Sequence, residues 1–263
     1  MNALLLTLAL SISDPSAGAE AHPVEAPRHA FRLGVECRDD ARSARPHFAE
    51  AARRYRQFWE RGERSANLAQ SWARAEFLAG KLPEAIVAAH QGLRIAPQHV
   101  GLQWDLETFR DAVVPSANPT PGLTNRPPRL SGVRARISEW DLFWATAGAT
   151  ALVGIGLMRR FTCGGAWARM LAILGAAGLV GCASLSAKRD LEGREDRASP
   201  LWVLREDSLL RKGNGESHAA RIEAPIPRGA EVRELAVRGG WIQVRLAGDS
   251  VGWLPEGALL PVP

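Results

Sequence analysis

Two uncharged apolar runs in the second half of the chain, at residues 142–158 and 170–187, restrict the fold more than any other feature. As a helix the second run spans about 27 Å, close to the hydrocarbon thickness of a bilayer, which is about 30 Å. Large aromatic residues lie at the ends of the runs, where interfacial side chains are expected: Trp140, Trp144, Phe161 and Trp167. The segment between the runs is too short to form a domain. The sequence therefore predicts a transmembrane α-helical hairpin over residues 138–187.

The second run contains a Leu-Val-Gly-Cys sequence at residues 179–182, which resembles the lipobox of bacterial lipoproteins, whose cysteine is acylated. Lipoprotein processing requires an N-terminal signal, and this motif lies far from the N-terminus. Small residues that let two membrane helices pack closely produce the same pattern: Gly175, Ala176, Gly178 and Gly181. A chain that restarts at Met158 would carry the motif near its N-terminus, so lipidation of Cys182 stays an alternative. Both interpretations place Cys182 at the outer face of the same membrane.

The N-terminus predicts the orientation of the chain. An apolar run at residues 3–12 is followed by Ala17-Gly18-Ala19, a small-x-small cleavage site, which predicts a signal peptide over residues 1–19. The positive-inside rule gives no decision, because arginines lie both in the hairpin loop and before the hairpin: Arg159, Arg160, Arg169, Arg126, Arg129, Arg134 and Arg136. The signal peptide decides instead. From it we expect a protein of the bacterial cytoplasmic (inner) membrane, with both flanking domains extracytoplasmic and the hairpin loop in the cytoplasm.

The first domain is predicted to be helical over residues 27–114, because apolar residues recur there at intervals of three and four. The pattern is sharpest at residues 66–97. There Gly80 suits a turn between two helices, Pro83 an early position in the second helix, and Pro97 its end. We expect an apolar seam between these two helices, formed by Leu78, Ala85, Ile86, Ala89 and Leu93.

This pair of helices resembles a tetratricopeptide repeat. When Pro97 is taken as the closing proline of a 34-residue unit, Gly80, Ala85 and Leu93 fall on the expected turn and packing positions. The front of the unit departs from the pattern: Ala69 and Glu76 stand where aromatic residues are usual, and Ala73 stands where glycine is usual. A generic helical hairpin is the alternative.

A second repeat and a cap would complete the helical domain. Upstream, aromatic and alanine residues fit the second helix of another repeat: Phe48, Ala51, Ala52, Tyr55 and Phe58. Downstream, residues 101–113 suit a capping helix. Two repeats with a cap are near the minimum that can bury a shared core.

The repeat resemblance also implies a peptide-binding groove. In such a hairpin the first helix lines the concave face, and the matched register puts Asn67, Gln70, Arg74 and Phe77 there. Polar and basic groups suit an extended, partly acidic peptide, which Arg74 would hold through charge-assisted hydrogen bonds. A solvated helix face is the alternative.

The C-terminal region, residues 200–263, changes from helical periodicity to the alternation of short β-strands. A Pro/Arg-rich linker at 115–137 precedes the hairpin, and a charged spacer at 188–199 follows it. The expected strands are Leu201–Leu204, Ser208–Arg211, Glu231–Ala236, Trp241–Leu246 and Val251–Leu254. A segment of this size and texture predicts a small all-β barrel. The chain as a whole is thus a multidomain protein.

Two glycine–tryptophan strands make this barrel resemble a bacterial SH3 domain, the SH3b module. The matching residues are Gly240-Trp241, Val244, Gly252-Trp253 and Leu254. Alternation along the first strand sends Ile242, Val244 and Leu246 to the core and Trp241, Gln243 and Arg245 to the outer face. We therefore expect a ligand surface that contains Trp241, Gln243 and Arg245, together with Trp253, whose face the alternation decides less clearly. A tryptophan that only covers the barrel's edge is the alternative.

The order of these parts resembles the BatE-type proteins of bacterial aerotolerance operons. Those proteins combine a signal peptide, tetratricopeptide repeats, a two-helix membrane hairpin and a C-terminal SH3b domain. The resemblance implies a membrane-embedded scaffold, not an enzyme, with envelope or membrane proteins as partners. It points in particular to von Willebrand factor A-domain membrane proteins associated with a MoxR-type ATPase. A peptidoglycan-binding module is the alternative function.

The residues favour neither catalysis nor nucleic-acid binding. No nucleophile elbow, P-loop, metal-ligand spacing or paired-carboxylate motif occurs, so we expect no catalytic residues, no metal and no cofactor. Cys37 with His29 or His47 is the one conceivable nucleophile pair. The net charge of +5 comes almost wholly from arginines scattered along the chain, because the only lysines are Lys81, Lys188 and Lys212. Scattered arginines do not form the basic patch that nucleic acid requires.

Overall fold

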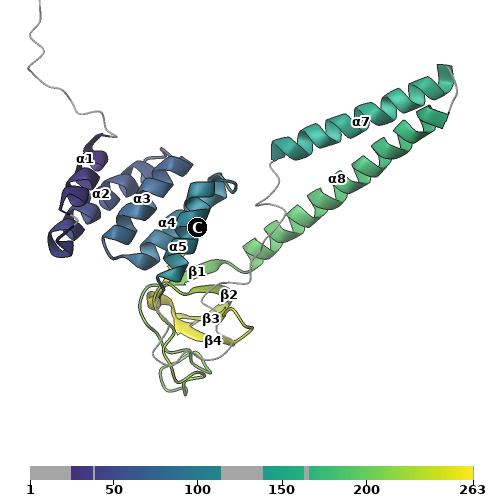
Figure 1. Cartoon of the computed structure of the whole chain (residues 1–263). Coiled ribbons are helices and arrows are strands. Elements are labelled where there is room, and N and C mark those ends of the chain that lie inside the picture. Colours follow the sequence, from purple (N-terminus) through teal and green to yellow (C-terminus); the bar gives the residue numbers. More distant parts are fainter. Residues whose placement is uncertain (1–24, 38, 114–138, 163–165, 263) are drawn as a thin grey trace, which may run out of the picture.

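The structure is a computed structural model that describes residues 25–37, 39–113, 139–162 and 166–262. It consists of five packed helices, a long helical hairpin and a small β domain (Figure 1). Most of the elements are helical, as expected. The predicted signal peptide and linker lie outside the described residues, as do residues 163–165 of the predicted hairpin loop. The rest of that loop is helical, because α7 and α8 extend into it from both sides.

Five helices form the N-terminal domain: α1 (Glu25–Glu36), α2 (Ala41–Glu60), α3 (Ala66–Leu78), α4 (Leu82–Ile95) and α5 (Val100–Asp111). Each helix packs on the next, and α3 also packs on α5. Short side chains begin two of them: the side chains of Asp40 and Ser65 accept hydrogen bonds from backbone N–H groups in the first turns of α2 and α3. Gly80 makes the turn before α4 with a positive φ of 83°, and Pro83 lies in the first turn of α4.

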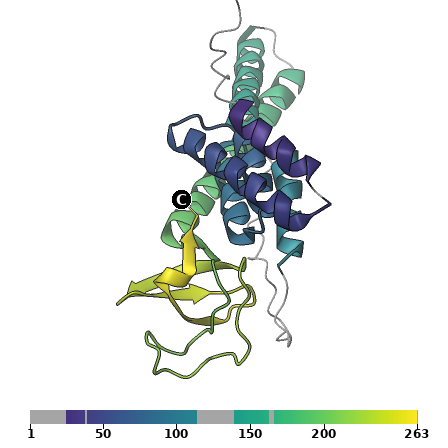
Figure 2. The ribbon, with the colours of Figure 1, turned by 90° about the vertical axis from the view of Figure 1, so that its left-hand side faces the viewer.

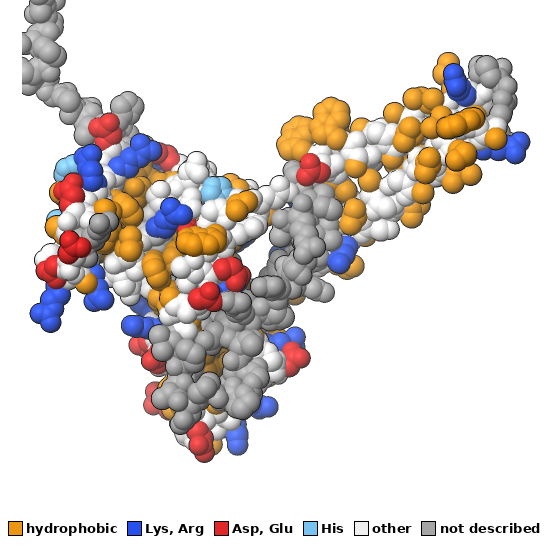
Figure 3. Space-filling model, viewed as in Figure 1, with side chains coloured by type: hydrophobic (Ala, Val, Ile, Leu, Met, Phe, Trp, Pro, Cys, Tyr) orange, Lys and Arg blue, Asp and Glu red, His pale blue; other side chains and the backbone are white. Residues whose placement is uncertain are grey.

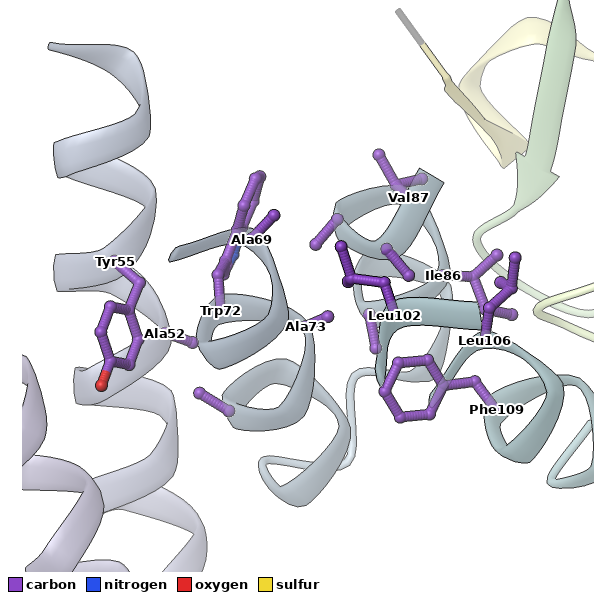
Figure 4. Packing of buried hydrophobic residues seen from close by; sticks show 14 of the residues in the cluster. Ala52, Tyr55, Ala69, Trp72, Ala73, Ile86, Val87, Leu102, Leu106 and Phe109 are labelled. Atoms are coloured by element: carbon purple, nitrogen blue, oxygen red, sulfur yellow. The ribbon is translucent and has the colours of Figure 1, made fainter. Parts of the chain in front are cut away.

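Small residues let α3 and α4 approach closely. Five alanines in their interface are completely buried: Ala69, Ala73, Ala85, Ala88 and Ala89. Larger side chains fill the layer beside them, and Figure 4 shows Leu102, Leu106 and Phe109 of α5 next to Ile86 of α4. Of the expected seam, Ala85, Ile86 and Ala89 are fully buried and Leu93 is partly buried, whereas Leu78, the last residue of α3, is 42% exposed.

The hairpin consists of α7 (Glu139–Thr162) and α8 (Ala166–Ala198), and both helices are long and apolar enough to cross a membrane. Their backbones come close at glycines: a Cβ on Gly156 would lie 2.7 Å from the Ala172 nitrogen, and one on Gly175 would lie 2.7 Å from the Val153 nitrogen. Figure 3 shows hydrophobic side chains along the visible surface of the hairpin, whereas charged side chains gather on the other two domains. The helix α8 continues beyond the apolar run, so the predicted charged spacer is helical as far as Ala198.

The C-terminal β domain contains a five-stranded antiparallel sheet in the order β4-β3-β2-β1-β5. The strands are β1 (Leu201–Leu204), β2 (Glu231–Arg238), β3 (Trp241–Arg245), β4 (Val251–Pro255) and β5 (Leu259–Pro261). Gly239 and Gly240 form the two-residue turn between β2 and β3, and both have a positive φ. The β-domain core consists mainly of buried aliphatic side chains, including Leu204, Leu210, Ile242, Val244 and Leu254.

Two strands differ from the sequence prediction. Residues 208–211 form only isolated bridges, from Ser208 to Ile226 and from Arg211 to Ala220 and Trp253. Their neighbours lie in an irregular segment, so no continuous ladder can form. The edge strand β5 was not expected, because three residues ending in proline carry almost no alternation.

The β domain lies against the helical domain in both views (Figures 1 and 2). The contact involves α4 on one side and strands β1 and β5 on the other. Both domains lie at the end of the hairpin where α7 begins and α8 ends (Figure 1). The hairpin thus brings together two domains that are far apart in the sequence.

Candidate binding surfaces

The four residues predicted on α3 lie on one surface and all contact α5 or the turn before it. Arg74 donates two hydrogen bonds to Asp105, from Nε to Oδ2 at 2.7 Å and from Nη2 to Oδ1 at 3.1 Å. The Asp105 side chain is buried, whereas the Arg74 side chain is 48% exposed. The guanidinium is therefore already paired with a carboxylate, so an acidic ligand would have to share it with Asp105 or displace Asp105.

The neighbouring polar groups on α3 are also engaged. The Gln70 amide donates from Nε2 to Asp105 Oδ2 at 2.9 Å. His99 Nδ1 accepts a hydrogen bond from the Leu102 backbone at 3.1 Å, so Nε2 carries the ring proton and donates to Asn67 Oδ1 at 3.2 Å. These hydrogen bonds fix the orientation of the side chains before any ligand arrives.

The aromatic member of the set, Phe77, stacks on Phe109 with ring centroids 4.8 Å apart. Phe77 is half-buried and Phe109 is buried. We call the surface formed by Asn67, Gln70, Arg74, Phe77 and Trp104 the α3–α5 surface.

The sequence interpretation missed Trp104, which lies on α5 beside Asp105 and is 66% exposed. Its signal was readable, because Leu102, Leu106 and Phe109 define the buried face of the helix and Trp104 falls on the opposite side. Val100, one turn earlier, is exposed as well. A large exposed aromatic side chain next to paired polar groups suits the anchoring of an extended peptide.

The residues predicted on the β domain also share one face. Along β3, Ile242 and Val244 are fully buried, whereas Trp241 and Gln243 are half-buried and Arg245 is exposed. The expected division into core and outer sides is therefore present in the structure.

Trp253 joins the same face, which the sequence left undecided. On β4 the residues before and after it, Gly252 and Leu254, are buried, and a Cβ on Gly252 would lie 2.5 Å from Leu210 Cγ. Trp253 is half-buried and pairs with Gln243 across the sheet, while Trp241 pairs with Pro255. We call the surface formed by Trp241, Gln243, Arg245 and Trp253 the tryptophan face. Partly exposed indole rings can stack on a peptide or on a sugar ring.

The sequence matches no protein-family model and no curated protein, and the structure matches no solved structure. Within the ranges that the structure describes, no group of three or more His, Cys, Asp or Glu side chains is placed to hold a metal ion.

Proposed function

We propose that this protein is a membrane-anchored, non-catalytic adaptor that binds envelope proteins or peptides through its helical and β domains. The observation that carries this proposal is the arrangement of the hairpin. Its two apolar helices run out and back, so α8 ends near the start of α7, and both folded domains lie at that end. A chain of this design holds two binding domains next to one membrane surface.

We further propose that the helical domain is a pair of tetratricopeptide repeats with α5 as their cap, and that the β domain is an SH3b module. The helix–turn–helix pairing of α3 and α4 about Gly80 supports the first assignment. The outward Trp241 and Trp253 support the second. The predicted signal peptide supports an extracytoplasmic location for both domains. The resemblance to BatE-type proteins implies von Willebrand factor A-domain proteins as partners.

Peptidoglycan binding is the second candidate function. The tryptophan face favours it, because two half-buried indoles with a glutamine between them can stack on sugar rings and bind their hydroxyl groups. The α3–α5 surface favours the adaptor, because an exposed tryptophan, Trp104, next in sequence to the Asp105 that pairs with Arg74 suits a peptide better than a glycan.

Co-purification from native membranes separates the two functions. We expect the full-length protein to retain specific membrane partners, and Arg74→Glu to lose them while Arg94→Glu, a charge reversal at an exposed position on α4, retains them. If wild-type protein instead sediments with purified sacculi and Trp241→Ala abolishes that sedimentation, the peptidoglycan function is correct. Partner capture that survives Arg74→Glu in a folded protein would contradict binding at the α3–α5 surface.

The orientation has its own test. A reporter that is active only outside the cytoplasm should be active when fused after Pro263 and inactive when inserted at Gly164-Gly165. The reverse pattern would contradict both the signal peptide and the extracytoplasmic location. Cys182→Ser should leave the protein in the membrane fraction, and its release into the soluble fraction would support lipidation instead.

A further inference from the structure

The contact between the helical and β domains has an apolar layer and one buried charge. Val203 of β1 is fully buried among core residues of the helical domain, and Leu260 and Val262 pack against the same cluster. A Cβ on Gly229 would lie 3.0 Å from Val113 Cγ2 and 3.4 Å from Ile86 Cδ1. The β domain thus covers the end of the helical array, where an uncovered apolar surface would otherwise meet water.

The buried charge is Glu231, the first residue of β2. Its side chain is completely buried, and both of its carboxylate oxygens are bound by the helical domain. Arg110 of α5 donates from Nε to Oε2 at 3.0 Å and from Nη2 to Oε1 at 3.2 Å. His90 Nε2 of α4 contacts Oε1. One carboxylate of the β domain therefore connects to two helices of the other domain.

The carboxylate is charged while the domains are docked. Burial raises the pKa of Glu231, but His90 and Arg110 outweigh burial and hold the pKa below its usual range. Removing Glu231 leaves the nearly buried Arg110 with only the more exposed Glu107, and removing Arg110 leaves Glu231 with His90 alone. Either loss disfavours the buried arrangement. Separation of the domains would relieve that penalty by returning the groups to water.

Reversible docking also fits the connections of the two domains. The β domain is attached to α8, since Arg233 Nη1 donates to the Ser199 carbonyl and the Glu234 backbone donates to the Pro200 carbonyl, both at 2.9 Å. The helical domain connects to the hairpin through residues 114–138, which include the predicted linker. Contacts between domains of one chain are commonly modest in area and open reversibly.

We propose that Glu231 is a charge-dependent latch that holds the β domain on α4 and α5 as the cap of the helical array, and that neutralising it separates the two domains while each stays folded. The proposal goes beyond the adaptor function and does not depend on which partner is bound. In this proposal the β domain of the same chain covers the α4–α5 end of the helical domain.

Two buried valines of the β domain provide matched probes. Val203 faces the helical domain, whereas Val244 lies in the core of the β domain, and both are fully buried. In full-length protein in detergent micelles, with the native cysteines replaced by serine, each valine is changed separately to cysteine and its thiol-labelling rate is measured. Glu231→Gln should accelerate labelling at position 203 about tenfold or more and leave position 244 protected.

The outcomes decide the proposal. Unchanged labelling at position 203 would show that docking does not need the charge, and an equal acceleration at position 244 would show that Glu231 serves the fold of the β domain. Either result would overturn the latch. Arg110→Gln changes only the helical domain and should accelerate labelling at position 203 as well. Glu107→Gln, which removes the more exposed partner of Arg110, should not.

Discussion

Two carboxylate–arginine pairs fasten α5, and they differ in how much water they meet. Asp105 binds Arg74 of α3, and Arg110 binds Glu231 of β2. The carboxylate is buried in both pairs, but the Arg74 side chain is 48% exposed and that of Arg110 only 13%. Water screens the first pair, whereas the second can be hydrated only if the domains separate. The same chemistry therefore joins two helices weakly in one place and controls the docking of a domain in the other.

Arg110→Met should lower the free energy of unfolding more than any other substitution in this comparison. It keeps the apolar stem of the side chain but leaves Glu231 with His90 alone, so we expect the free energy of unfolding to fall by about 3 kcal/mol or more. Urea unfolding of the full-length protein in micelles, followed by tryptophan fluorescence, measures this loss. A loss no greater than that caused by Arg74→Met would show that burial of the pair makes no difference.

Val244→Ala and Trp241→Ala extend the contrast between buried and hydrated side chains to strand β3. Val244→Ala should lower the free energy of unfolding by about 1–3 kcal/mol, because it leaves a cavity in the β-domain core. Trp241→Ala should cost less stability and instead weaken ligand binding, since its ring lies on the outer face. Thermal denaturation of both variants tests the order. A larger loss for Trp241→Ala would place the tryptophan in the core.

Acid should weaken the latch. The docked pKa of Glu231 is held below its usual range, so the separated state binds more protons. The stabilisation is therefore complete above the ordinary pKa of a glutamate and is lost as the pH falls through the docked pKa. The groups that face the carboxylate are His90 and Arg110, with Glu107 on the far side of Arg110.

The size of this effect has an upper limit. One proton changes the stability by at most about 1.4 kcal/mol per pH unit. Thermal midpoints recorded from neutral pH down to acid should fall more steeply for wild-type protein than for Glu231→Gln. Parallel curves would show that other groups cause the acid sensitivity.

Arg74→Met should lower the free energy of unfolding least. Because Arg74 is half-exposed, we expect a loss of about 1 kcal/mol or less, and added salt should reduce the difference from wild type. Melting in low and high salt measures it. A loss that is large and independent of salt would mean that Asp105 needs Arg74 as strongly as Glu231 needs Arg110.

Local patterns in the sequence predicted the elements that local chemistry determines. Gly80 and Pro83 mark the turn between α3 and α4, and the alternation of Ile242 and Val244 identifies the core side of β3. The strand β5 escaped prediction because it is held by pairing with β1 and by packing on α4, not by a pattern of its own.

The binding partners of the predicted site residues could not be read in the same way. Arg74 was expected to meet a ligand, but its carboxylate comes from Asp105, which lies 31 positions later. His90 and Arg110 are separated from Glu231 by the linker and the hairpin, so no local spacing brings the carboxylate to them. Only the docking of the two domains makes them neighbours.

The helix α8 continues without a break beyond the apolar run, and this extension separates β1 from the end of that run by a fixed distance. Between the end of the apolar run and Ala198, residues 188–198 rise about 16 Å at 1.5 Å per residue. Only Ser199 and Pro200 separate this helix from β1, and both of their carbonyls are hydrogen-bonded to β2. For a hairpin that crosses a membrane, this part of α8 is therefore a stalk that holds the start of β1 about that far from the end of the apolar run.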